Sequence, residues 1–189
     1  GTFGATQVLG NTTFGEGWFA TSSQPRVFVG DTTGDSVAEI VGVAPNGKGN
    51  GDVWVARPTS GGWTQKVWLF ESRFKTGGAE DWFTLASQQR VWLSDVTGDA
   101  RADLVGIGAT GEIWVARATS VTSTDASAAA YSFQPSLRVA QSGLVDSSTT
   151  NGFFSTSSKR RVWLADATGD LVNDAIAIAP SIAKDGSKN

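Results

Sequence analysis

Apolar and polar residues alternate in short runs along this chain, and one such run occurs three times. The runs RVFVGD, RVWLSD and RVWLAD occupy residues 26–31, 90–95 and 161–166. Alternation in segments rich in valine and aromatic residues is typical of β-strands with one buried face. No segment shows the period of about 3.6 residues that an amphipathic helix requires. The pattern therefore predicts an all-β protein built from repeats.

Each of these runs begins a set of expected strands that follows the same order. The second strands are expected at 38–45, 102–109 and 173–180, the third at 51–60 and 111–120, and the fourth at 2–9, 63–70 and 132–139. In the first of the third strands, Val53 and Val55 should face one side of the sheet and Trp54 the other. Four short strands per repeat, separated by turn residues, are the pattern of a β-propeller blade.

The repeats divide the chain into three expected four-stranded blades at residues 1–60, 61–120 and 121–189, and the last blade lacks its final strand. Propellers close with about four to eight blades. An open stack of sheets would also expose unpaired strand edges, which soluble proteins avoid. We therefore expect a partial propeller completed by further blades, either from a longer chain of which this is a fragment or from other copies of the same chain.

An acidic segment lies between the first and second expected strands of every repeat. Oxygens at positions 1, 3, 5 and 9 of such a loop can converge on one hard cation, as in aspartate-rich calcium loops. Here these positions are Asp31, Thr33, Asp35 and Glu39; Asp95, Thr97, Asp99 and Asp103; and Asp166, Thr168, Asp170 and Asp174. The pattern makes Ca²⁺ a candidate cofactor, although threonine in place of a middle acid should weaken binding.

The same acidic segments also suit a hydrogen-bonded turn that needs no metal. Aspartates in such turns accept hydrogen bonds from backbone N–H groups a few residues further on. The glycine in each DxTGD motif allows the positive φ that such a turn requires. The sequence leaves both interpretations open, and occupancy by calcium can differ between repeats.

The residue types that are absent exclude most catalytic chemistry. The chain has no histidine and no cysteine, so histidine-based triads, thiolate metal sites and disulfides are excluded. A mechanism that uses only carboxylates, as in glycosidases, needs just two placed acids. The acids here are copied into every repeat, whereas a catalytic pair is a singular feature of a fold. We therefore expect that the protein is not an enzyme.

Charge and hydrophobicity indicate which binding partners and which cellular location to expect. The chain has 15 lysines and arginines against 18 acidic residues, with no basic run to neutralise phosphates, so nucleic acid is not an expected partner. No apolar run reaches the roughly 20 residues of a membrane helix, so membrane insertion is not expected. Calcium-type loops, many serines and threonines and a glycosylation sequon at Asn11 favour a secreted, extracellular protein.

Five motifs in a fixed order carry a resemblance to a known family. The order is GTF, GW, PR, DxTGDxxxD and VWV, and it begins at Gly1, Gly17, Pro25, Asp31 and Val53 in the first repeat. This order resembles the FG-GAP or VCBS repeats of integrin-like β-propellers, and most closely the Psathyrella velutina lectin family. An aromatic residue also lies eight positions before the arginine in all three repeats, and the resemblance covers nearly the whole chain.

The chain departs from that family at the residue after the second aspartate of each loop. The family has glycine there, whereas this chain has Ser36, Ala100 and Leu171. The second loop is expected to be the most competent for calcium, because Asp103 keeps the shorter carboxylate that the family uses, although Arg101 adds a positive charge nearby. An insertion near residues 118–130 is a further departure.

The resemblance implies sites for N-acetylglucosamine or sialic-acid-type sugars between neighbouring blades. Sugars stack an apolar face on an aromatic ring and are fixed by a few polar groups. The expected carbohydrate-binding residues are Trp18 with Arg26, Trp82 with Arg90, and Arg161, whose aromatic partner Phe153 makes a weaker site. The tryptophans at 54, 92, 114 and 163 are expected to pack as core.

Two functions remain open at this stage. A non-catalytic lectin that binds glycans or glycoproteins accounts for repeated sites and for the absence of histidine and cysteine. A structural, adhesion or scaffolding segment of a larger extracellular or fibre-forming protein accounts equally well for the open-ended row of blades and for the resemblance to integrin-type repeats.

Overall fold

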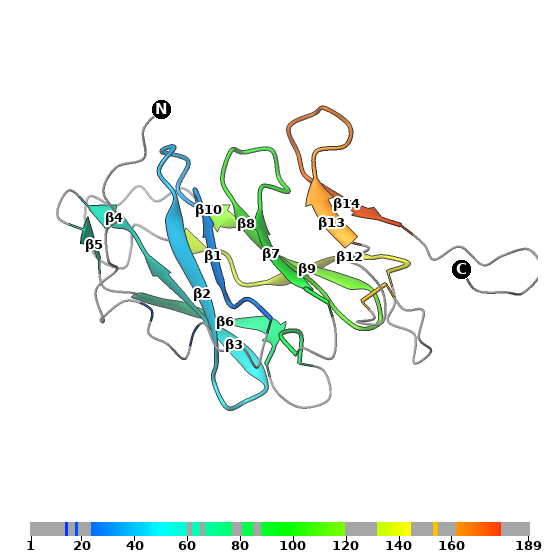
Figure 1. Cartoon of the computed structure of the whole chain (residues 1–189), viewed down its shortest axis with the longest axis horizontal. Coiled ribbons are helices and arrows are strands. Elements are labelled where there is room, and N and C mark those ends of the chain that lie inside the picture. Colours follow the sequence, from blue (N-terminus) through cyan, green and yellow to red (C-terminus); the bar gives the residue numbers. More distant parts are fainter. Residues whose placement is uncertain are drawn as a thin grey trace, which may run out of the picture.

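The fold is all-β, as the alternating pattern predicted. The computed structural model describes residues 14, 18, 24–59, 62–64, 67–76, 81–84, 88–119, 132–144, 153–154 and 162–178. Over these residues the strands form several antiparallel sheets, none of which closes on itself. The sheets follow one another in a row in the order of the sequence (Figure 1).

Sheet 1 contains four strands of the first repeat, and neighbouring strands are consecutive apart from a small hairpin. Its order is β1 (Val27–Gly30), β2 (Glu39–Pro45), β3 (Asn50–Ala56) and β6 (Val67–Lys75). The hairpin of β4 (Pro58–Thr59) and β5 (Gly62–Trp63) connects β3 to β6. The expected boundary between residues 60 and 61 thus lies inside the chain segment that forms this sheet.

Sheet 2 has the same strand arrangement, and the described residues of sheet 3 form its first two strands. Sheet 2 has the order β7 (Val91–Ser94), β8 (Asp103–Ile107), β9 (Glu112–Ala116) and β12 (Leu137–Gln141), with a small hairpin of β10 (Ala118–Thr119) and β11 (Ser132–Phe133). Sheet 3 is described as β13 (Val162–Ala165) paired with β14 (Asp174–Ala177). The expected strand at 2–9 lies outside the described residues.

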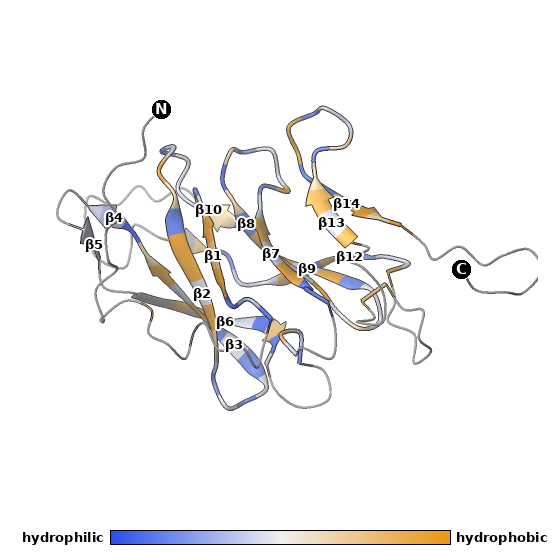
Figure 2. Cartoon of the chain, in the orientation of Figure 1, coloured by the Kyte–Doolittle hydropathy of each residue, from blue (hydrophilic) through white to orange (hydrophobic). Residues whose placement is uncertain are grey.

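The strand register places the buried valines of neighbouring strands on one face of the sheet. In sheet 1, Val41 lies opposite Val55 and Val43 lies opposite Val53, and all four side chains are fully buried. Trp54 points to the other side of β3 and is half-buried, which confirms the predicted alternation. Figure 2 shows the resulting apolar strands between hydrophilic loops.

The sheets pack on one another through two apolar clusters. The first cluster joins the four valines of sheet 1 and Phe74 to Leu104 and Ala116 of sheet 2. The second contains Trp92, Ile107, Phe154 and Val162, and it holds sheet 3 against sheet 2. Trp92 is thus a core residue, as expected, while Trp54 and Trp114 are half-buried against neighbouring clusters. Trp163 is half-buried as well.

An aromatic ring covers one glycine in the second strand of sheets 1 and 2. A Cβ atom on Gly106 would lie 2.4 Å from the Trp82 ring, and one on Gly42 would lie 2.6 Å from the Trp18 ring. In sheet 3 the equivalent residue is Ala177, and it packs in the same cluster as the smaller Phe153. A large ring therefore accompanies glycine, and a smaller ring accompanies alanine.

We predict that Gly106→Ala destabilises the protein by about 1–3 kcal/mol, because the added methyl overpacks the space that the indole of Trp82 fills. Urea denaturation measures the change in the free energy of unfolding. Adding Trp82→Phe should recover part of the loss, because it recreates the alanine–phenylalanine pair of sheet 3. The control Gly143→Ala, which has open space around the new methyl, should have little effect. Equal losses at positions 106 and 143 would contradict the packing argument.

Candidate functional site

Three acidic loops project from the same edge of the row of sheets (Figure 1). Loop 1 (residues 31–38) joins β1 to β2, loop 2 (95–102) joins β7 to β8, and loop 3 (166–173) joins β13 to β14. Each loop is closed at its base by an antiparallel pair in the same register, from Gly30 opposite Glu39 to Ala165 opposite Asp174. The three copies of the sequence motif therefore form loops at equivalent positions of the three sheets.

The first aspartate of each loop is surrounded by backbone donors from its own loop. Asp31 accepts hydrogen bonds from the backbone N–H groups of Thr33 (3.0 Å), Gly34 (2.6 Å) and Ser36 (2.6 Å). Asp95 accepts the three equivalent bonds in loop 2. Asp166 accepts two of them in loop 3. The carboxylate therefore organises the turn without any other ligand.

These donors determine the protonation state of the first aspartates. Partial burial opposes ionisation of Asp31 and Asp95, but the backbone N–H groups outweigh it and lower both pKa values. At Asp166 the N–H of Gly169 is the largest effect, and it lowers the pKa of this exposed carboxyl. Hydrogen bonds to a charged carboxylate are stronger than those to a neutral group. All three aspartates are therefore ionised near neutral pH.

The turn requires left-handed backbone at two positions per loop. Gly34 has φ 79° and Ser36 has φ 66°, and the equivalent residues of the other loops share these conformations. Ala100 has φ 63° and Leu171 has φ 67°, although residues with a Cβ atom rarely adopt this region. These are the positions where the resembling family has glycine, so the loops keep the geometry that glycine favours without the residue itself.

In repeats 1 and 2 the last acid of the motif, which is the first residue of the second strand, turns inward and closes the loop from below. Glu39 is fully buried and accepts hydrogen bonds from the backbone N–H and the hydroxyl of Thr32. Asp103 is also fully buried and accepts bonds from the backbone N–H groups of Val96 (3.2 Å) and Ala118 (2.8 Å). Burial raises the pKa of Asp103 to about 6, and it raises the pKa of Glu39 as well.

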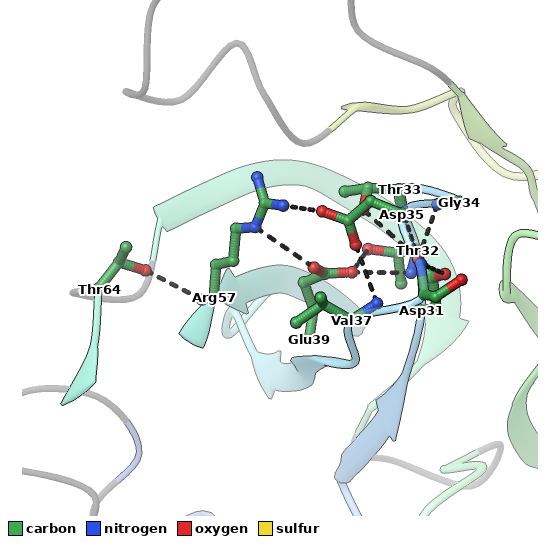
Figure 3. A network of polar contacts seen from close by, with 10 residues as sticks. Asp31, Thr32, Thr33, Gly34, Asp35, Val37, Glu39, Arg57 and Thr64 are labelled. Carbon is green, nitrogen blue, oxygen red and sulfur yellow. Dashed lines mark hydrogen bonds and ion pairs between the residues drawn. The ribbon is translucent and has the colours of Figure 1, made fainter. Parts of the chain in front are cut away.

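Arginine side chains bind the middle acid of the first two loops. In loop 1 the guanidinium of Arg57 pairs with Asp35, and its Nε lies 3.7 Å from the buried Glu39 carboxylate (Figure 3). In loop 2 Arg101 pairs with Asp99 at 2.7 Å. In loop 3 the Asp170 carboxylate accepts the N–H of Val172. No basic side chain within the described part of the chain pairs with loop 3.

In this conformation the loop acids are held by backbone N–H groups in all three loops and by arginine in loops 1 and 2. Among the residues that the structure describes, no three acidic side chains are arranged to hold one metal. The guanidinium of Arg57 provides positive charge at loop 1, where a cation was expected. Loop 3 is the loop whose acids are held by backbone groups alone. Calcium binding by the twelve candidate ligands stays a prediction.

The candidate sugar-binding pairs lie in the junctions between sheets. Trp82 and Arg90 are each only 3% exposed. Arg90 stacks on the ring of Phe154 at 4.1 Å and donates to the carbonyl oxygens of Ile107 and Gly108. The ring of Trp82 faces Phe74 at 5.8 Å. A pyranose cannot stack on this tryptophan while sheets 1 and 2 remain packed.

In the pair of Trp18 and Arg26, the arginine stacks on a phenylalanine in the same way, at the junction between sheets 1 and 2. Arg26 is buried, stacks on the ring of Phe83 at 4.5 Å and lies 3.7 Å from Asp81. Burial of this guanidinium is the largest effect on its pKa, which it lowers. Trp18 is half-buried and meets Phe14 edge to face at 4.8 Å. Arg161 lies outside the described residues.

Sequence reasoning missed the phenylalanines on which the arginines stack. Phe83 follows Trp82, and Phe154 follows Phe153, so each aromatic pair belongs to the repeat after its arginine. The aromatic dipeptide that recurs in repeats 2 and 3 was the feature of the sequence that could have revealed these phenylalanines. A buried cation over an aromatic face contributes about 2 kcal/mol. The arginines thus join one repeat to the next.

A cleft of about 500 Å³ lies between sheets 2 and 3. Its apolar wall includes Val105, Val115 and Leu164, and its polar groups include Arg117 and Asp174. The cleft was not predicted as a sugar site, although Thr97 and Asp174 in its lining were candidate calcium ligands. Residues equivalent to Val105 and Val115 in sheet 1 are Val41 and Val55, which sheet 2 covers completely.

We predict that Ala100→Gly stabilises the protein by about 0.5–1 kcal/mol, because glycine relieves the left-handed strain at φ 63°. Chemical denaturation measures the difference. The control Ala109→Gly lies in a turn without positive φ and should instead destabilise by about 0.5 kcal/mol. A loss of stability at both positions would contradict the strain argument.

We predict that the protein is more stable at about pH 5 than at about pH 7.5, with a melting temperature a few degrees higher. In the folded protein the pKa of Asp103 is about 6, above its ordinary value of 3.8. Protonation of Asp103 therefore stabilises the folded state. This contribution to the free energy of unfolding is complete below pH 3.8 and is lost as the pH rises through 6. Glu39 acts with the same sign. The first aspartates, whose pKa values are lowered, lose their contribution only in stronger acid.

Calorimetric melting curves of the wild type and of Asp103→Asn across this pH range test the assignment. The amide cannot titrate, so most of the pH dependence should disappear in the variant, whatever its absolute stability. An unchanged pH dependence would show that another group is responsible.

Comparison with protein families, with curated proteins and with solved structures finds no match to this chain. Over the residues that the structure describes, no helix is long and apolar enough to cross a membrane. The function is therefore argued from the geometry of the loops, the junctions and the cleft.

Proposed function

We propose that this chain is a non-catalytic carbohydrate-binding module of the β-propeller type, and that sugar binds in the cleft between sheets 2 and 3. The cleft is the observation that carries the proposal. Its volume of about 500 Å³ lies within the range of roughly 300–1,000 Å³ that is usual for small-molecule sites. Its position between neighbouring sheets agrees with the site that the lectin resemblance implied.

The chemistry of the cleft suits a sugar. Leu137 and Val139 of β12, which are 60% and 58% exposed, offer apolar surface for the C–H face of a pyranose, and Arg117 and Asp174 offer charged groups for its hydroxyls. A few polar groups on a mostly apolar surface are the usual composition of ligand sites. This arrangement replaces the tryptophan–arginine pairs as the proposed contact, because Arg26, Trp82 and Arg90 are buried in the junctions.

The propeller architecture is part of the proposal. Sheets 1 and 2 each have four antiparallel strands in sequence order, the three loops share one edge, and the arginine–phenylalanine stack occurs at both junctions. Propeller blades are four-stranded sheets arranged around an axis. An extracellular location belongs to the same proposal and rests on the sequence features alone.

Glycan-array binding followed by titration calorimetry tests the carbohydrate proposal. We expect Arg117→Ala to weaken sugar binding by about tenfold or more, because it removes a charged hydrogen-bond donor from the cleft. The matched control is Arg138→Ala on β12, an exposed arginine that does not line the cleft. Binding that is equally reduced in both variants, or no binding by the wild type, would refute the proposed site. Turnover of a glycoside would refute the non-catalytic assignment.

Calcium binding is proposed for loop 3 first. Asp166, Thr168, Asp170 and Asp174 would hold the ion there, because no described arginine neutralises these acids. Titration calorimetry of chelator-treated protein should show heat at calcium concentrations of about 0.1–1 mM, the range of weak extracellular sites. Asp170→Asn should reduce this heat, whereas Asp35→Asn in loop 1 should leave it unchanged. No heat in the wild type would remove calcium from the proposal without affecting the sugar site.

A second candidate function is a scaffold or adhesion segment. The burial of Trp82, Arg26 and Arg90 in the junctions favours it, because these residues hold repeats together rather than contact a ligand. Self-assembly without any glycan binding would favour this second function over the first.

A further inference from the structure

The two junctions between sheets use the same backbone contact at equivalent positions. The backbone N–H of Ala102 donates to the carbonyl oxygen of Asp31 at 2.6 Å, which links loop 2 to loop 1. The N–H of Asn173 donates to the carbonyl oxygen of Asp95 at 2.9 Å, which links loop 3 to loop 2 in the same way. In each case the later loop donates and the earlier loop accepts.

Side chains of the later repeat fill spaces over small residues of the earlier one. Leu93 and Ala102 of repeat 2 pack against Gly30, where a Cβ atom would lie 2.9 Å from Leu93 Cδ2 and 3.1 Å from Ala102 Cβ. Val172 of repeat 3 packs in the same manner over Gly98 of loop 2. The junction thus has an accepting half on the earlier repeat and a donating half on the later one.

The accepting half is exposed on repeat 3. Ile178 is 62% exposed, whereas the equivalent Val43 and Ile107 are fully buried against the next sheet. A Cβ atom on Gly169 would meet nothing within 4 Å, although the equivalent Gly98 is covered. Asp166, whose carbonyl oxygen is equivalent to the two acceptors, is exposed as well.

The donating half is exposed on sheet 1. Val29 is 67% exposed, whereas the equivalent leucines at positions 93 and 164 pack into the two apolar clusters. Val37, equivalent to Val172, is also exposed. Within the described part of the chain, no backbone partner is found for the N–H of Ala38, which is equivalent to Ala102 and Asn173.

We propose that copies of this chain associate head to tail, with repeat 3 of one copy docked on sheet 1 of the next. The new junction continues the two existing ones: Ala38 N–H donates to the Asp166 carbonyl oxygen, and Val37 covers Gly169. A second copy is the occupant that fits, because one chain exposes both complementary halves of a contact that it already makes twice. A heterologous contact of this kind forms a ring if the rotation closes and a filament if it does not.

This inference does not depend on sugar binding. It concerns the outer faces of the row, whereas the proposed sugar site lies between sheets 2 and 3. Loss of one property would therefore leave the other intact, and the two can be measured separately.

Cysteine cross-linking tests the register of the junction, because the chain contains no cysteine. The existing contact between positions 30 and 102 shows that equivalent positions bring Cβ atoms close enough for a disulfide. Ala165 and Ala38 are the equivalent positions on the two outer faces, and both are exposed. An oxidised mixture of the single variants Ala38→Cys and Ala165→Cys should give a covalent dimer of the two.

The matched control replaces Ala165→Cys by Ala140→Cys, an exposed strand alanine in the middle repeat. Adding Val29→Asp to the Ala38→Cys chain should reduce the dimer by about tenfold or more, because a charge would be buried in the junction. Circular dichroism confirms that each variant is folded. Equal yields with Ala140→Cys and Ala165→Cys, or wild-type protein that stays monomeric by light scattering at every concentration, overturn the proposal.

Discussion

The second strands of sheets 1 and 2 are buried on both faces, and this constraint decides how the sheets are arranged. In β2 the residues from Glu39 to Val43 are all buried, and in β8 the residues from Asp103 to Ile107 are buried in the same way. A single sheet of this composition cannot exist alone in water, because burial of apolar surface is the main favourable term in folding. Neighbouring repeats must therefore cover one another, and the row of sheets follows from that need.

The acidic loops serve this arrangement by fixing the edge at which the repeats meet. The first aspartate is ionised and accepts backbone N–H groups, so the loop keeps its shape and its carbonyl oxygen points at the next loop. The last acid is buried, and its pKa is raised by the same burial that closes the loop. Asp95 and Asp103 thus have opposite pKa shifts, because backbone N–H groups outweigh burial at the first and burial dominates at the second.

Three residues expected at a sugar site, Arg26, Trp82 and Arg90, are buried in the junctions between sheets. A tryptophan and an arginine at fixed spacing are suitable for a pyranose, but they are equally suitable for packing between two sheets. The structure places the aromatic partner of each arginine in the following repeat, so the pair joins blades. The cleft between sheets 2 and 3 then becomes the better candidate for a ligand, since Leu137 and Val139 in its lining are exposed.

The sequence by itself determined the all-β class, the order of strands within a repeat and the alternation of Val53, Trp54 and Val55, because these depend on local period and turn residues. It also offered turns with aspartate acceptors as one of two interpretations of the DxTGD segments, beside a calcium loop. Only the tertiary structure decided that Arg57 reaches the acids of loop 1 and that Arg90 lies on Phe154. These contacts join residues far apart in the chain, and their formation depends on which sheets face each other, a property that no local pattern encodes.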